Sequence, residues 1–143
     1  MQFFVSPITL IFLFNATLLL ILGSFLFFNQ KSKYVLFYSI IMYLIALWAL
    51  FSAAEIGSLT VDLRILFSKL EFISVVAIGP LWLMFSMYYA EIDTKRYKYL
   101  KYILLFMYFS LISLVFTNEI HHLVWTGYSQ IGSNITDGLV FEH

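Results

Sequence analysis

A few charged side chains interrupt long apolar stretches of this sequence, and they are the first candidates for a functional role. Lys69 and Glu71 open a stretch that is otherwise almost wholly apolar as far as Tyr89, and Glu55 closes the apolar run before it. A charge in such a stretch is costly unless it lies near an interface, is paired, or faces a cavity. Glu71 therefore has two interpretations. Its side chain either reaches the membrane surface or pairs with Lys69 or Arg64, which is a structural role. Alternatively, it contacts a ligand or a proton.

A second polar group lies in the segment 118–125, where Asn118 precedes the adjacent pair His121 and His122. Adjacent residues cannot point the same way on a helix, and the histidine spacing matches no known metal-ligand pattern, so we predict no metal site. We expect the following residues to surround a cavity open to the outside and to contact the signal: Glu55, Lys69, Glu71, Asn118 and His121.

No catalytic motif occurs in the sequence. It has no phosphate-binding loop, no nucleotide-binding glycine pattern, no nucleophile elbow and no Ser/His/Asp set. We therefore predict no catalytic residues and no cofactor, so that the chain itself is not an enzyme.

The elements that must position the polar residues are membrane helices. The chain is 62% hydrophobic and only 11% charged, with a mean hydropathy of +0.93, whereas soluble domains carry about a quarter charged residues. This composition predicts an all-α integral membrane protein with four transmembrane helices. The predicted spans are about 8–28, 34–54, 66–90 and 99–117. The remainder, 118–143, is predicted to be an extracytoplasmic loop or tail, in which 127–137 has the composition of a loop.

The basic residues predict the orientation of these spans. Those in the first and third connections are Lys31, Lys33, Lys95, Arg96, Lys98 and Lys101, and those on the opposite side are Arg64 and Lys69. Because basic residues concentrate in cytoplasmic loops, the N-terminus is predicted to be outside a plasma membrane that the chain crosses several times.

Two features of the apolar spans have structural and functional interpretations. Pro80 lies in the middle of the third span, where it predicts a kink that is either an ordinary membrane-helix proline or a hinge that relays movement. The spacing of Ala46, Ala49 and Ala53 gives the second span a thin face that another helix can approach closely. Trp48 and Trp82 are expected to serve in helix packing.

Four motifs then follow one another along the chain. They are Trp48-x₆-Glu55, Lys69-Leu-Glu71, Pro80-Leu-Trp82-Leu-x-Phe85 and Thr117-Asn118-x-x-His121-His122-Leu-Val-Trp125. In this order and at these spacings they resemble the N-terminal seven-helix membrane region of bacterial and archaeal sensor histidine kinases.

The resemblance implies a sensor domain, 1–143, that contributes the first four helices of a seven-helix bundle. It implies a lipid bilayer around the helices, a small-molecule or membrane signal, and a cytoplasmic kinase module outside this sequence; a homodimer is possible and no nucleic acid is expected. His121 cannot be a phosphoacceptor because the predicted topology places it outside the cell. Two alternatives remain open: a small transporter subunit, or an assembly protein that binds partners through its alanine face.

Overall fold

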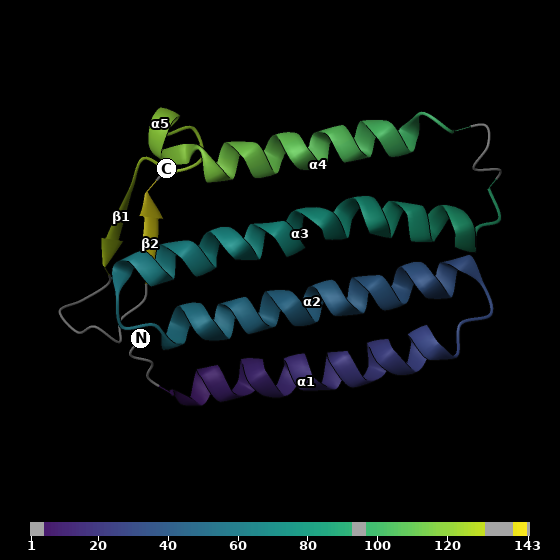
Figure 1. Ribbon diagram of the computed structural model, residues 1–143, viewed down its shortest axis with the longest axis horizontal. Coiled ribbons are helices and arrows are strands. Elements are labelled where there is room, and N and C mark those ends of the chain that lie inside the picture. Colours follow the sequence, from purple (N-terminus) through teal and green to yellow (C-terminus); the bar gives the residue numbers. More distant parts are fainter. Residues whose placement is uncertain (1–4, 93–96, 131–138, 143) are drawn as a thin grey trace.

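The structure, a computed structural model, describes residues 5–92, 97–130 and 139–142. Within them, the helices are α1 (Pro7–Phe28), α2 (Lys33–Gly57), α3 (Val61–Tyr89), α4 (Leu100–Phe116) and the short α5 (Asn118–His121), followed by strands β1 (Gly127–Gln130) and β2 (Leu139–Glu142). The four long helices lie side by side in chain order, and each runs antiparallel to the next (Figure 1). Helix contacts join α1 to α2, α2 to α3, and α3 to α4, so the helices form an open layer.

Local sequence sets the beginning of the first helix. Ser6 is the N-cap of α1: its hydroxyl accepts a hydrogen bond from the Thr9 backbone N–H at 3.1 Å, and the Thr9 hydroxyl accepts one from the Ser6 N–H. Pro7 occupies the first helical turn, where a missing N–H costs nothing. Ser6 and Thr9 therefore form a capping box that fixes the beginning of the first apolar helix.

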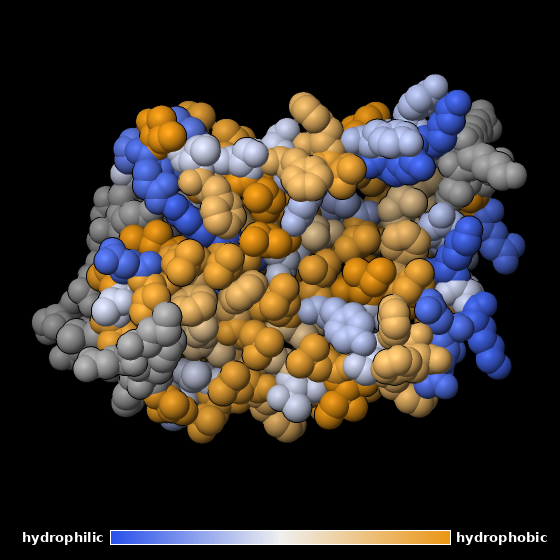
Figure 2. Space-filling view, in the orientation of Figure 1, coloured by the Kyte–Doolittle hydropathy of each residue, from blue (hydrophilic) through white to orange (hydrophobic). Residues whose placement is uncertain are grey.

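Small residues occupy many of the buried positions between the helices, and many large apolar residues face outwards. The buried positions of α1 to α3 include Ala16, Gly23, Ser39, Ala46, Ala49, Ser52, Ala53 and Ser74. A Cβ added at Gly23 would lie 3.3 Å from the Cβ of Met42, so α1 and α2 approach closely there. Figure 2 shows the result, an apolar surface across the helical layer. This arrangement suits a protein whose surroundings are lipid.

Three of the four predicted membrane spans correspond to helices that could cross a membrane. In the described part of the chain, α1, α2 and α3 are long and apolar enough to cross a membrane, while α4 is apolar but has 17 residues. The all-helical membrane fold is confirmed, and the fourth span stays a prediction. α3 runs as one 29-residue helix through Pro80, and a kink at Pro80 stays a prediction too.

Helix bounds and the tail depart from the sequence prediction. α2 continues to Gly57 and α3 begins at Val61, so the connection between them shrinks to residues 58–60. The segment 127–137 was expected to be a loop, but its first four residues form β1, which pairs antiparallel with β2 so that Gly127 lies opposite Glu142. Two strands of four residues each carry too little alternation to be recognised, so this part of the prediction was wrong.

Candidate functional site

The antiparallel order of the helices gathers the predicted site residues at one end of the layer. The end of α2, the beginning of α3 and the end of α4 meet there, beside α5 and the two strands (Figure 1); we call this the α5 end. The opposite end, which we call the basic end, carries Lys31, Lys33, Lys98 and Lys101. Lys95 and Arg96 lie outside the described residues.

Glu71 on α3 is contacted from α2. The Trp48 indole Nε1 donates a hydrogen bond to Glu71 Oε2 at 3.0 Å. The Glu55 carboxyl lies close enough to Glu71 to interact with it directly, and Arg64 acts on Glu55 electrostatically. We call Trp48, Glu55, Arg64 and Glu71 the α2–α3 polar cluster.

Arg64 is a buried member of this cluster. It is 3% exposed, and its Nε donates to the Ser58 carbonyl at 2.9 Å. Ser58 is itself fully buried, and its hydroxyl donates to the Ala54 carbonyl at 2.6 Å. The guanidinium therefore joins the beginning of α3 to the C-cap residue of α2, which fixes the short connection between the helices.

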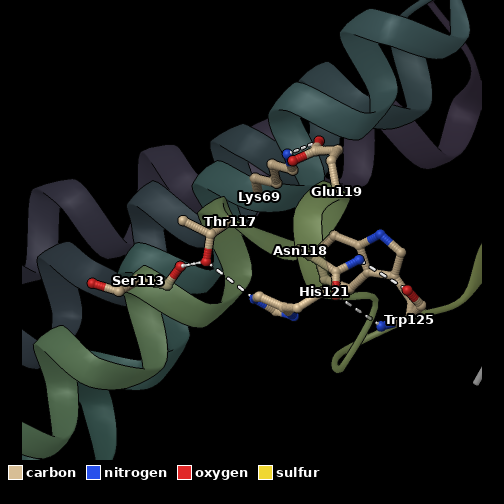
Figure 3. Close-up of polar contacts among 7 residues, drawn as sticks. All are labelled: Lys69, Ser113, Thr117, Asn118, Glu119, His121 and Trp125. Atoms are coloured by element: carbon tan, nitrogen blue, oxygen red, sulfur yellow. Dashed lines mark hydrogen bonds and ion pairs between the residues drawn. The ribbon is translucent and has the colours of Figure 1, made fainter.

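Lys69 faces a different neighbour from Glu71. Two residues along a helix correspond to a rotation of about 200°, and Lys69 Nζ pairs with the Glu119 carboxylate on α5 (Figure 3). The Lys69 side chain is 10% exposed and that of Glu119 is 56% exposed. The hydrogen bond from Lys69 holds the pKa of Glu119 below its usual value. A cavity of about 270 Å³ lies beside the pair and is also lined by Asp62 and Leu66.

Asn118 organises the turn that follows α4. It is 1% exposed, and its Oδ1 accepts from the backbone N–H groups of Val124 at 2.8 Å and Trp125 at 3.3 Å. Its Nδ2 donates to the Trp125 carbonyl at 2.9 Å (Figure 3). His122 adopts a left-handed conformation with φ of 50°, which ends α5, and the buried Trp125 ring lies against Phe72. The Asn118 side chain thus serves the turn itself.

His121 is held by its own segment as well. Its Nδ1 accepts from the Leu123 backbone N–H at 3.1 Å, so the proton of a neutral ring is on Nε2, which lies 3.1 Å from the Thr117 hydroxyl (Figure 3). The Thr117 hydroxyl in turn donates to the Ser113 carbonyl at 2.6 Å. No group of three His, Cys, Asp or Glu side chains able to hold a metal occurs among the described residues.

The five predicted sensing residues therefore fall into two groups. Glu55 and Glu71 belong to the α2–α3 polar cluster, whereas Lys69, Asn118 and His121 lie with α5. Helix α3 connects the groups because it carries both Lys69 and Glu71. Contact of any of the five with a ligand stays a prediction.

The remaining predicted residues lie elsewhere on the helices. Ala46, Ala49 and Ala53 are buried within the chain. Trp82 is half-exposed, with its ring centroid 5.3 Å from that of Phe85 on the same helix. Pro80 lies along α3 towards the basic end, apart from both polar groups.

Sequence reasoning missed three participants in the site. Arg64 entered only as a basic residue on one side of the membrane and as a partner for Glu71, yet it is buried and acts electrostatically on Glu55. Glu119 and Thr117 were not among the five predicted sensing residues, although both contact members of that set. Their position beside Asn118 in a polar segment was the available signal, but the pairing with Lys69 depends on how α5 lies over α3.

Comparisons with known proteins identify the family. A search of curated proteins and a search of solved structures each returned no match. A family model described as the N-terminal 7TM region of histidine kinase matches residues 11–143, which takes in nearly all of α1 and every later element. This region is the sensor part of such kinases and not their catalytic domain. The chain belongs to the family of N-terminal seven-transmembrane regions of histidine kinases.

Proposed function

We propose that this membrane region receives a signal at its α5 end and relays it, as a displacement of α3, to a cytoplasmic histidine kinase module beyond the basic end. One observation carries the proposal. α3 is held near its beginning by α2 through Glu71 and by α5 through Lys69, and it then continues as one helix to Tyr89 at the basic end. An event that changes either contact therefore acts on one continuous helix that reaches the other side of the layer.

The distribution of charge supports an N-terminus outside the cell. Six basic residues belong to the first and third connections as predicted from the sequence, and two, Arg64 and Lys69, lie at the α5 end. Under the positive-inside rule the basic end faces the cytoplasm and the α5 end faces outwards. The kinase module would then join the region on the side where ATP is found.

The receiving site would consist of the α2–α3 polar cluster and the cavity beside Lys69 and Glu119. The cluster offers carboxylates and an indole N–H, and the cavity of about 270 Å³ offers an ammonium and a carboxylate. These groups suit a small polar molecule or a proton. Pro80, which lacks the N–H that would bond within the helix, is the proposed hinge between the receiving part of α3 and its basic end.

The structure offers less support for an assembly protein that binds partners through its alanines. Ala46, Ala49 and Ala53 are at most 6% exposed within the single chain. Another membrane helix could reach that face only by displacing a neighbour of α2.

The test is the kinase output of membranes that contain a histidine kinase carrying this region. Glu71→Gln keeps the size of the side chain and removes its charge, so it should change basal autophosphorylation or its response to external pH several-fold. Glu91→Gln is the matched control, because Glu91 is exposed and lies after α3 at the basic end. Unchanged output from Glu71→Gln under every condition, with the protein still inserted, would contradict the proposal.

A further inference from the structure

An apolar groove separates α3 from α4 on the way to the basic end. Its volume is about 270 Å³. The residues that line it include Pro80, Leu81 and Met84 of α3 and Leu104 and Leu105 of α4, with Lys101 as its charged member. Towards the α5 end Tyr108 lines the groove, and its hydroxyl donates to the Ile73 carbonyl at 3.2 Å. The groove is therefore apolar along its length and cationic at one end.

A second cavity continues the groove at that cationic end. It has a volume of about 240 Å³ and shares Met84 and Lys101 with the first. Tyr97 and Lys98 also line it. An elongated ligand with an apolar tail and an anionic head could occupy both cavities at once.

The two lysines at this end are available to an anion. Lys101 Nζ lies 4.8 Å from the centre of the Tyr102 ring, and Lys98 Nζ lies 4.9 Å from that of Tyr99. Among the described residues neither lysine pairs with a carboxylate. An ammonium resting on an aromatic ring keeps N–H groups free for a phosphate oxygen.

We infer that this groove binds an anionic glycerophospholipid, with its phosphate between Lys98 and Lys101 and part of one acyl chain along Pro80, Met84 and Leu105. Charge complementarity selects this occupant, because a helix of apolar residues would cover the groove without supplying an anion to the lysines. Basic pockets between helices at the membrane surface favour such headgroups. This inference is independent of the signal that the α5 end receives, and it places a lipid chain against the proline of α3.

The test uses the whole chain in phosphatidylcholine nanodiscs that contain a trace of lipid with a photoactivatable group in its acyl chain. Phosphatidylglycerol carrying the probe should label peptides of α3 and α4 around Met84 and Leu105 several-fold more than phosphatidylcholine carrying the same probe. Lys98→Gln and Lys101→Gln should each lower the phosphatidylglycerol labelling on the order of five-fold. Lys31→Gln, which removes an exposed charge at the same end of the layer but away from the groove, should leave it unchanged.

A second pair of variants tests the groove itself. Ala77 lines it, and Ala77→Phe should reduce labelling by both lipids because it fills the space without removing charge. Since the sequence contains no cysteine, Leu105→Cys introduces a single reactive thiol, and efficient disulfide dimers of that variant would show that a second copy occupies the groove instead. Such dimers, equal labelling by the two lipids, or a loss with Lys31→Gln equal to that with Lys101→Gln would each overturn the inference.

Discussion

The indole N–H of Trp48 on α2 donates a hydrogen bond to the carboxylate of Glu71 on α3, at 3.0 Å across the interface of the two helices. A hydrogen bond between membrane helices contributes roughly 0.6 kcal/mol on average, so this one orients Glu71 more than it stabilises the fold. The Glu71 carboxylate also interacts with Glu55, which lies on α2 as Trp48 does. The proposed reception of a signal by Glu71 is thereby coupled to the position of α2.

This contact predicts a selective spectroscopic change. The chain has three tryptophans, so a ¹⁵N-labelled sample gives three indole N–H resonances, and Trp48→Phe identifies the one that belongs to Trp48. Glu71→Gln should shift that resonance upfield, because an amide oxygen is a weaker acceptor than a carboxylate, and should leave those of Trp82 and Trp125 in place. A Trp48 resonance that does not move would show that the indole is not bonded to Glu71.

The class of fold could be predicted from the sequence because the pattern of apolar residues reflects the bilayer that surrounds the helices. Long apolar runs separated by short polar connections are what a bilayer requires, and the small residues Ala46, Ala49 and Ala53 marked a close-packed position of α2. The strands β1 and β2 could not be predicted in this way. Their pairing depends on two four-residue segments that are separated by eight residues in the sequence.

The candidate site was predicted as a list of residues and not as an arrangement. Lys69 and Glu71 are neighbours in sequence, and a mutual ion pair was one natural expectation. The helix instead turns Lys69 towards Glu119 and Glu71 towards Trp48. Choosing between these partners requires the positions of α2 and α5 around α3, which no local pattern in the sequence contains.

The pair of Lys69 and Glu119 should respond unequally to loss of its two members. The Lys69 side chain is 10% exposed and that of Glu119 is 56% exposed. Glu119→Ala leaves a buried ammonium without its carboxylate and should lower the free energy of unfolding by about 1–3 kcal/mol. Lys69→Met leaves only a solvated carboxylate and should cost less than about 1 kcal/mol. Thermal unfolding in detergent measures both, and equal losses would contradict the unequal burial.

The same pair predicts a pH dependence. Because the hydrogen bond from Lys69 lowers the pKa of Glu119, the unfolded chain takes up the proton at a higher pH than the folded one. The stabilising effect is complete above the ordinary glutamate pKa of about 4.3 and disappears as the pH falls through the lower pKa of the folded state. Glu119→Gln should therefore flatten the fall in melting temperature below pH of about 4.3 by a small amount, since Glu119 is more than half exposed. An identical fall in the variant would exclude a contribution from Glu119.

Asn118 should be essential to the turn after α4. Asn118→Ala removes two hydrogen bonds to backbone N–H groups and one to a carbonyl in a fully buried position, which should cost about 2–3 kcal/mol. Trp125 should then become more exposed, which red-shifts its fluorescence in a Trp48→Phe, Trp82→Phe background. Asn29→Ala is the control, because Asn29 bonds only the Phe25 carbonyl at an exposed helix end. A Trp125 emission that is unchanged in Asn118→Ala would show that the turn does not depend on this side chain.

The orientation of the layer can be tested with single cysteines, because the sequence has none of its own. Thr60 is exposed in the connection between α2 and α3 at the α5 end, and Gln30 is exposed in the connection between α1 and α2 at the basic end. With the N-terminus outside, a membrane-impermeant maleimide should label Thr60→Cys in intact cells and Gln30→Cys only after the membrane is permeabilised. The reverse pattern would place the α5 end in the cytoplasm. Glu71 and the cavity beside Lys69 would then face the kinase side, and reception of an external signal by these residues would be excluded.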